Sequence, residues 1–309
     1  MSSLRIGTFG LPLAPLLLMR DGHIVCWSLL SPVAAPGRRR LRAALPAASV
    51  VDLLDDDFGF ERHVDTWLDE SPVDLIVSWY YTRRIEERWL RRPPLGAIGA
   101  HPSLLPRHRG PNPFFWAIDA GDEETGVTVH RLESDYDSGA ILAQHRLAIG
   151  GKNAWQLARA LDRPSLQALR EVVGNWNAGC PRDGKTQKSE DSTWAPEPTG
   201  DRLRVDWNWP TERILRRIRA LSPVPGLALE LNRQRFFVTD AAPASDFASA
   251  LRPGEAFLGT RLLLRTGDGA LVVERAQMAP TGEDCSGSPA EHGERSEVSG
   301  ELLVNLLKA

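Results

Sequence analysis

Short apolar runs alternate with helical patterns through the first 180 residues of this 309-residue chain. The runs are too short for buried helices and are rich in β-branched and aromatic residues, so we read them as strands. The expected strands lie at 5–10, 23–30, 48–54 and 73–80, and candidate helices between them lie at about 11–20, 60–70 and 84–91. Strands that alternate with helices are typical of a parallel sheet with right-handed crossovers. We therefore predict an open α/β sheet that binds ligands beyond the carboxyl ends of its strands.

The pattern continues after a Pro-rich loop with a helix over 112–121. Two further strands are expected at 126–132 and 141–149, and a loop rich in Asp, Ser and Gly joins them. A long helix is expected over 154–178, and we predict that Pro164 divides or kinks it. These elements complete a domain that we place at residues 1–180.

A second, smaller domain is expected at the carboxyl end. Residues 181–202 are polar, rich in Pro and Gly and without any period, which is typical of a linker. Within residues 203–309, a helix over 211–221 precedes short strands at 227–232, 234–241, 261–267 and 270–277. This pattern predicts a small β-barrel or barrel-like module. Residues 281–300 have low hydrophobicity, and we expect a mobile loop there.

Charge and cysteine content exclude several classes of protein. The net charge of −3 and the pI near 6.2 give no general reason to bind nucleic acid or an acidic membrane. The three cysteines, Cys26, Cys180 and Cys285, are odd in number and have no C-x-x-C spacing, which disfavours a disulfide scaffold or a metal site. The apolar stretch 11–19 is too short to span a bilayer. We expect a soluble protein of the cytoplasm that uses no metal and no membrane.

His101 and Asp137 are the candidate catalytic residues. His101 lies in IGAHPSLLPRHRG (98–110), at the expected carboxyl end of a strand, and its imidazole suits proton transfer near neutral pH. Asp137 lies in the loop between two strands, where a carboxylate could orient His101 and favour its protonated form. Both residues also have structural interpretations: a histidine bonded within a turn, and an Asx-turn aspartate. The residues alone leave these alternatives open.

Two other stretches could contact a ligand. The tract WYYTRR (79–84) follows a strand directly, so its rings and arginines could line a pocket for a flat ligand with anionic groups. It could equally be core packing flanked by solvated arginines. The run GRRRLR (37–42) could contact phosphates, although such a run is more often a solvated helix start. We keep nucleic-acid binding as a minority hypothesis.

Three motifs in order resemble the formyltransferase family that uses 10-formyltetrahydrofolate. HPSLLPRHRG (101–110) resembles its Asn-x-His-x-Ser-Leu-Leu-Pro loop, and GVTVHRLESDYDSG (126–139) resembles its Gly-Val-Thr and Asp-x-Gly signature. Residues 192–226 resemble the start of the carboxyl-terminal domain of methionyl-tRNA formyltransferases. SWYYTRRI and DSGAILAQHRLAI are most similar to the enzyme domain that formylates UDP-4-amino-4-deoxy-arabinose. The resemblance implies a Rossmann-like domain, an OB-like domain and formyl transfer from folate to a primary amine.

The resemblance also implies roles for individual residues. His101 matches the family's catalytic histidine and Asp137 the aspartate that raises the pKa of that histidine. Two segments match those that hold the folate, largely through backbone groups: Arg83, Arg84 and Ile85, with Glu133, Ser134, Asp135 and Tyr136. The candidates for contact with the acceptor, or for replacing a missing amide, are Tyr80, Tyr81 and Asn112.

Gly99 departs from the family pattern. The family has an asparagine two residues before the histidine, and its amide would donate a hydrogen bond to the oxyanion of the tetrahedral intermediate. Loss of one such donor typically lowers the rate by about 10²–10³. Pro111 is a second departure, since the sugar-nucleotide enzyme has an arginine there.

Three hypotheses follow. The leading one is a formyltransferase that acts on an amino sugar or a related small amine, with a sugar nucleotide as a candidate acceptor. The second is a binding protein or an impaired enzyme on the same fold, because Gly99 lacks the amide. The third is formylation of methionyl-tRNA, which the carboxyl-terminal likeness favours.

Overall fold

The computed structural model describes residues 3–55, 59–180, 183–245, 250–278 and 295–308. The chain divides into two compact units, each formed by several stretches of chain. The first comprises Met1–Pro113, Thr125–Ala148 and Ala160–Pro196, and the second comprises Phe114–Glu124, Ile149–Arg159 and Glu197–Ala309. The domain boundaries expected from composition, with a linker at 181–202, stay a prediction.

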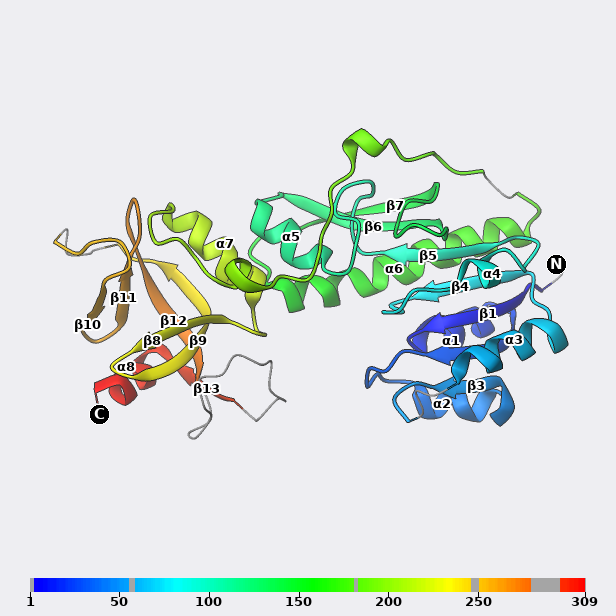
Figure 1. The fold of residues 1–309 in the computed structure, drawn as a ribbon, viewed down its shortest axis with the longest axis horizontal. Helices are drawn as coiled ribbons and strands as arrows, with labels where there is room; N and C mark the ends of the chain where they lie inside the picture. Colours follow the sequence, from blue (N-terminus) through cyan, green and yellow to red (C-terminus); the bar gives the residue numbers. More distant parts are fainter. Residues whose placement is uncertain (1–2, 56–58, 181–182, 246–249, 279–294, 309) are drawn as a thin grey trace. The chain divides into compact units, whose positions relative to one another are not determined.

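The first unit is built on a seven-stranded sheet (Figure 1). In spatial order its strands are β3 (Val50–Asp52), β2 (Ile24–Leu30), β1 (Arg5–Gly10), β4 (Leu75–Trp79), β5 (Ala97–His101), β6 (Glu124–Arg131) and β7 (Ile141–Ala148). The pairs from β3 to β5 are parallel, whereas β5 and β6 are antiparallel. The predicted parallel-rich sheet is confirmed. Because the strand order reverses between β1 and β4, ligands are expected near the carboxyl ends of these strands.

Helices cover both faces of this sheet. The helices of the amino-terminal half are α1 (Leu13–Arg20), α2 (Arg38–Ala44), α3 (Phe60–Glu70), α4 (Glu87–Leu90), α5 (Pro113–Ala120) and α6 (Ala154–Asn177), with 3₁₀ turns η1 (Ala47–Ser49) and η2 (Ser189–Asp191). One apolar cluster joins α1, α2 and α6 to one face of the sheet, and another joins α3 and α4 to the opposite face. Strands β1, β2, β4 and β5 are therefore buried on both sides, which explains why they read as continuous apolar runs.

Helix α3 illustrates how the sequence produces this layering. Val64, Trp67 and Leu68 follow the spacing of three and four that places side chains on one face of a helix, and all three are buried. The indole Nε1–H of Trp67 donates to the carbonyl oxygen of Ala48 at 2.8 Å, so its only polar group is satisfied in the core. The apolar face of α3 is thus fixed by burial and by one specific hydrogen bond.

Pro164 does not divide the long helix. The structure has one helix, α6, that continues through this position, so the predicted division is wrong, whereas the alternative of a kink stays a prediction. The missing N–H removes one intrahelical bond. Leu161, Leu166 and Leu169 around it are buried in the core, and this packing offsets the loss.

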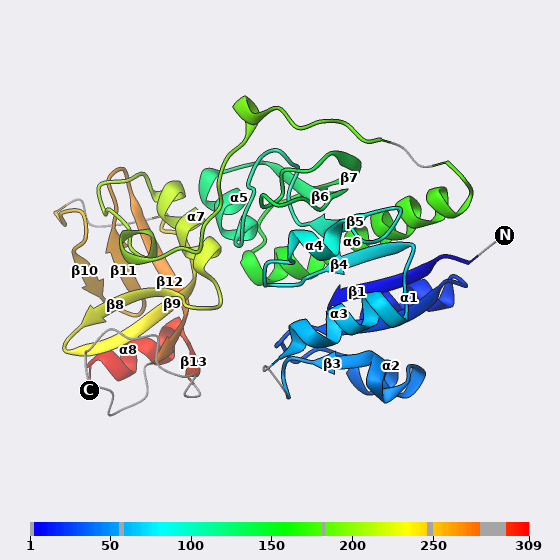
Figure 2. The same ribbon diagram turned by 45° about the vertical axis from the view of Figure 1, so that its right-hand side comes forward.

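The second unit contains a curled antiparallel sheet (Figure 2), which confirms the OB-like, barrel-like module. Its strands are β10 (Ala256–Leu258), β11 (Leu262–Arg265), β12 (Ala270–Met278), β9 (Gln234–Pro243) and β8 (Leu227–Leu231) in spatial order, with β13 (Ser296–Ser299) beside β12. The other elements are η3 (Gly200–Leu203), α7 (Thr211–Leu221) and α8 (Gly300–Lys308). Within the described ranges no helix is both long and apolar enough to cross a bilayer.

The mobile loop expected over 281–300 is corrected in part. Residues 281–294 lie outside the described residues. Residues 296–299 are not a loop but form β13, which pairs with β12 in antiparallel register. Val298 of β13 is buried, although the segment around it is polar in composition. The packing of this side chain and the pairing with β12 favour a strand here.

A buried carboxylate connects α5 to α7 within the second unit. Asp119 accepts hydrogen bonds from Arg213 Nη2 at 2.9 Å and from Arg217 Nε at 2.6 Å, and its side chain is 5% exposed. Arg217, itself 6% exposed, also donates to the carbonyl oxygens of Arg202 and Arg204, both at 2.7 Å. Burial would raise the pKa of Asp119, but the two guanidinium groups outweigh it and hold that pKa below its usual range. The buried Asp119 carboxylate and the buried Arg217 guanidinium therefore each offset the cost of burying the other's charge.

We expect Asp119→Ala to destabilise the protein by about 3–5 kcal/mol, because it leaves the buried Arg217 charge without its partner. Asp240→Ala is the matched control, since the Asp240–Arg275 pair is 43% and 55% exposed. Its loss should cost at most about 1 kcal/mol. Urea unfolding measures both variants, and equal shifts of the midpoint would contradict the role of the buried pair.

Candidate active site

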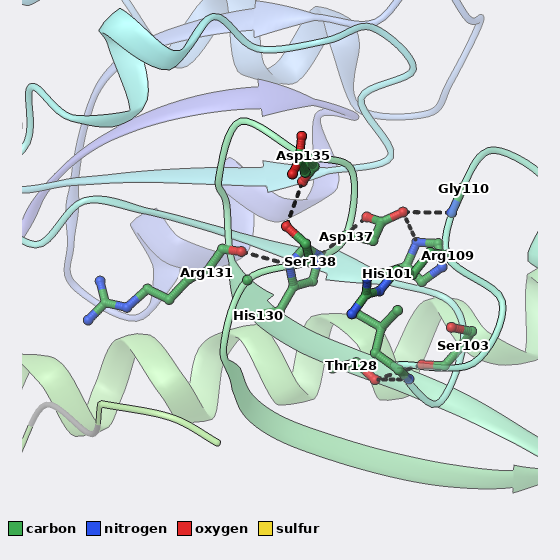
Figure 3. A network of polar contacts seen from close by, with 12 residues as sticks. His101, Ser103, Arg109, Gly110, Thr128, His130, Arg131, Asp135, Asp137 and Ser138 are labelled. Carbon is green, nitrogen blue, oxygen red and sulfur yellow. Dashed lines mark hydrogen bonds and ion pairs between the residues drawn. The ribbon is translucent and has the colours of Figure 1, made fainter. Parts of the chain in front are cut away.

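His101 is the last residue of β5 and lies among three neighbouring strand ends. In the register of the sheet, Gly99 pairs with Ser78 of β4 on one side and with His130 of β6 on the other. His101 pairs with Thr128 of β6. Residues that pair directly across two strands point to the same face. The register thus gathers Gly99, His101, Thr128 and His130 on one face of the sheet. The last three are drawn in Figure 3.

One nitrogen of His101 is fixed and the other faces a carboxylate. Nε2 lies 2.7 Å from the carbonyl oxygen of His108, and because a carbonyl can only accept, Nε2 carries the proton of that bond. Nδ1 lies 3.4 Å from Oδ2 of Asp137, which is longer than a normal hydrogen bond. Burial lowers the pKa of His101, while Asp137 and the His108 carbonyl counteract this only in part. The resting ring is therefore neutral, with the lone pair on Nδ1.

Asp137 is held in place by its backbone conformation and by a hydrogen bond to one carboxylate oxygen. Its φ angle of 52° lies in the left-handed region, which aspartate tolerates better than most residues. The backbone N–H of Gly110 donates to Oδ2 at 2.8 Å. Burial would raise the pKa of Asp137, but His101, His130 and this N–H outweigh it and hold that pKa well below its usual range. The carboxylate thus stays ionised beside a neutral imidazole.

His130 is a second histidine at this carboxylate, and the sequence pattern does not single it out. Its Nδ1–H donates to the carbonyl oxygen of Arg131 at 2.7 Å, and its Nε2 lies 3.5 Å from Oδ1 of Asp137. The side chain is 3% exposed. A period of two places His130 and Thr128 on one face of the strand, but only the register with β5 brings that face to His101.

The space above Gly99 is occupied by an apolar side chain. A Cβ atom placed on Gly99 would lie 2.8 Å from Cδ2 of Leu132, which is closer than van der Waals contact allows. The asparagine of the family pattern could fit here only if the flexible end of Leu132 moved. Leu132 therefore stands where the sequence comparison expects an amide.

The segment that the composition marks as a linker contributes to the site. Gln187 is buried, and its amide nitrogen donates to the carbonyl oxygens of Asp137 and Gly139, both at 2.7 Å. Trp194 pairs with Arg109 in a short bridge of backbone hydrogen bonds. The ring of Trp194 is 53% exposed and lies 6.3 Å from the ring of Tyr136. The polar sequence of 183–196 gives no sign of these contacts.

The two segments expected to hold folate lie next to each other. Arg84 Nη2 donates to the carbonyl oxygen of Ser134 at 3.0 Å, and so links one segment to the other. Arg83 lies over the ring of Phe60 at 5.6 Å, and Ile85 packs at the edge of the core. Glu133, Asp135 and Tyr136 are exposed, and the Asp135 carbonyl accepts from Ser138 Oγ at 3.0 Å.

The residues expected to contact the acceptor lie near these segments. Tyr80 packs against Trp79 with ring centroids 4.9 Å apart, and burial together with Asp162 raises the pKa of its hydroxyl above the usual range. Tyr81 packs against Phe9 at 5.2 Å. The backbone N–H of Asn112 donates to the carbonyl oxygen of Ala195 at 3.0 Å. Both tyrosine rings thus take part in packing, and their contact with an acceptor stays a prediction.

Two arginines of the basic run 37–42 are paired within the protein, and the described residues hold no metal cluster. Arg38 and Arg42 of this run both form ion pairs with Asp52, so intramolecular carboxylates take up their charge. Among the described residues, no group of three or more His, Cys, Asp and Glu side chains is placed to hold a metal ion.

Comparison with known proteins places both parts of the chain in one family. Residues 30–173 match the family model "Formyl transferase" and residues 199–284 match "Formyl transferase, C-terminal domain". HypX from Aquifex aeolicus in complex with tetrahydrofolic acid shares 19% identity, with a TM-score of 0.67 over 99% of this chain and 48% of that one. This chain therefore spans about half the length of HypX.

Two further solved structures share the fold over nearly their whole length. WlaRD, a sugar 3N-formyl transferase solved with dTDP and 5-N-formyl-THF, is 15% identical, with a TM-score of 0.66 over 91% of this chain and 100% of that one. The N-formyltransferase from Helicobacter canadensis, in complex with folinic acid and dTDP-3-aminofucose, is 13% identical, with a TM-score of 0.66 over 87% and 98%. At these identities the likeness shows a common fold.

We expect Asp137→Asn to lower the pKa of His101 further, because the carboxylate is the group that counteracts burial by stabilising the imidazolium. NMR titration of the carbon-bound imidazole protons measures this shift. Asp135→Asn is the control, since it removes an exposed carboxylate from the same loop. An unchanged or raised pKa of His101 in Asp137→Asn would contradict the electrostatic role of Asp137.

Proposed function

Because this chain belongs to the formyltransferase family, we propose that it transfers a formyl group from 10-formyltetrahydrofolate to the primary amine of an amino sugar carried on a nucleotide. The observation that carries this proposal is the buried His101 at the carboxyl end of β5 with the carboxylate of Asp137, 17% exposed, 3.4 Å from its Nδ1. Next to it lie the two folate segments, joined by the hydrogen bond from Arg84 to Ser134. A proton carrier and a cofactor cradle at one edge of the sheet are what formyl transfer requires.

The relatives of known structure support both substrates. HypX was solved with tetrahydrofolic acid, and WlaRD and the Helicobacter canadensis enzyme with formylated folates. The last two carry dTDP or a dTDP-linked amino sugar. We infer an acceptor of this class. The half-buried Tyr80 and Tyr81, which follow β4, are candidates for contact with it.

His101 is proposed to move the proton of the reaction. 10-Formyltetrahydrofolate supplies the formyl carbon, which the amine nitrogen attacks while the bond to N10 breaks. Nδ1 of the neutral His101 accepts the proton that the amine loses and returns it to the departing N10. The Nε2–H bond to the His108 carbonyl fixes the tautomer that leaves Nδ1 free for this step.

Asp137 is proposed to stabilise the charged form of His101. Its carboxylate lies 3.4 Å from Nδ1, and no hydrogen bond joins them in the resting state because Nδ1 carries a lone pair and the carboxylate can only accept. Once Nδ1 takes up a proton, the two groups become an ion pair in a buried site, where the attraction is strong. The hydrogen bond from Gly110 holds the carboxylate ready for that pairing before the reaction begins.

We expect the protein to release tetrahydrofolate in the presence of amino-sugar nucleotides and His101→Ala to lower kcat/KM by about 10²–10⁴-fold. An absorbance assay for tetrahydrofolate across a panel of acceptors measures this. His145→Ala is the matched control, because His145 is a partly exposed histidine of β7 that pairs with Glu171. The absence of turnover with every acceptor, together with no folate binding by calorimetry, would refute the proposal.

The double variant Gly99→Asn/Leu132→Ala tests whether the missing amide limits the rate. Leu132→Ala clears the space that a side chain at position 99 needs, and the restored amide should raise kcat by up to about 10²–10³-fold. Leu132→Ala alone is the control. A decrease in the double variant below that control would mean that Gly99 and Leu132 form part of a site adapted to another acceptor or reaction.

A further inference from the structure

The segment 183–196, here called the strap, is hydrogen-bonded to the loops that carry the site. Near its start, the backbone of Lys185 exchanges two hydrogen bonds with Ile141, both of 2.8 Å. Near its end, the Arg109 N–H donates to the Thr193 carbonyl at 2.9 Å, and the Ala195 N–H donates to the Arg109 carbonyl at 2.7 Å. The strap thus runs from the strand that follows the Asp137 loop to the loop that follows His101.

Between these two anchors, the side chain of Gln187 joins the same two loops. Its amide nitrogen donates to the carbonyl oxygens of Asp137 and Gly139, both at 2.7 Å. Its amide oxygen accepts from Arg109, at 3.0 Å from Nε and 2.7 Å from Nη2. Both N–H groups and both lone pairs of the Gln187 amide are used. The residue as a whole is 8% exposed. Only an amide can satisfy two acceptors on one side and a guanidinium on the other.

The position of Gln187 relates it directly to the catalytic carboxylate. Asp137 supplies a carboxylate oxygen to the N–H of Gly110, and Arg109 is the residue before Gly110 (Figure 3). Gln187 therefore binds the backbone of Asp137, which carries the carboxylate. It also binds the side chain of Arg109, the residue before the Gly110 N–H that donates to this carboxylate. Both partners of the Gly110–Asp137 hydrogen bond are tied to one buried amide.

The backbone of Asp137 has a conformation that surrounding contacts must hold in place. Its φ angle of 52° is unfavourable for a residue with a side chain, and such a conformation persists only where surrounding contacts enforce it. The carbonyl oxygens of Asp137 and Gly139 lie on either side of Ser138, and Gln187 binds both. The amide thus fixes the turn that directs the carboxylate towards His101.

We propose that Gln187 is a positioning residue of the reaction, which sets the placement of the Asp137 carboxylate against Nδ1 of His101. The inference rests on the proposed function and extends the catalytic machinery to the strap. Displacement of a catalytic group by about 1 Å can lower a rate by 10²-fold, so the loss of this tie should reach the chemistry.

Gln187→Ala tests the proposal by activity. We expect kcat/KM to fall by about 10- to 100-fold with KM for folate nearly unchanged. Gln187→Glu is the sharper variant, because it keeps the shape and the contact with Arg109 but cannot donate to the two carbonyls. It should lose as much activity as Gln187→Ala, and a wild-type rate in Gln187→Glu would overturn the proposal.

A matched variant separates positioning from simple loss of stability. Ser165→Ala removes a buried hydrogen bond, 2.7 Å long, from the indole of Trp79 and lies outside the strap. It should lower the urea midpoint while kcat is retained. If Gln187→Ala and Ser165→Ala lose activity only in proportion to their loss of folded protein, Gln187 is structural and the proposal fails.

The titration of His101 gives a readout that needs no turnover. His101 faces Asp137, His108 and His130, and of these groups Asp137 is the carboxylate that raises its pKa. A carboxylate that moves away in Gln187→Ala should lower the pKa of His101 by NMR, in the same direction as Asp137→Asn. An unchanged pKa would overturn the inference. If the wild-type protein transfers no formyl group, the proposed function fails, while this titration still decides the role of Gln187.

Discussion

The carboxylate of Asp137 is the group on which the arrangement of the site depends. It is ionised although its side chain is only 17% exposed, and a charge so far removed from water persists only when nearby donors and charges offset the loss of hydration. The N–H of Gly110 and the imidazoles of His101 and His130 surround it, and each comes from a different element. Strands β5 and β6 and the loops that follow them must therefore fold together before the carboxylate is satisfied. The chemistry of the site thus depends on the packing of this part of the sheet.

The pairing of β5 with β6 decides which side chains share the site. A shift of the register by one residue would turn His130 and Thr128 to the opposite face of the sheet. It would also move Leu132 away from Gly99. The parallel half of the sheet brings the end of β4 beside the end of β5, and with it the residues expected to meet the acceptor. The antiparallel half supplies the second histidine. The site lies where these two halves join.

Leu132 occupies the space above Gly99, where the resemblance leads us to expect an amide side chain. Removal of an amide from the face of a strand would leave a hole, and holes in a packed interior are costly. Here the methyl groups of Leu132 occupy the space that a side chain on Gly99 would need. The result is an apolar surface beside the His101–Asp137 pair, where the resemblance leads us to expect a hydrogen-bond donor.

The sequence by itself determined the parallel-rich sheet, the barrel-like second module and the family, because these follow from periodicity and from motifs that are local in the chain. It also marked His101 and Asp137, since each lies at a loop that the pattern places at a strand end. Only the tertiary structure placed His130 opposite Gly99, Leu132 over that glycine and Gln187 between the two loops. Those relations depend on strand register and on a polar strap that carries no periodic signal. Gln187 is buried because the loop of Asp137 and the loop of Arg109 both contact it. The residues next to Gln187 in sequence do not predict these contacts.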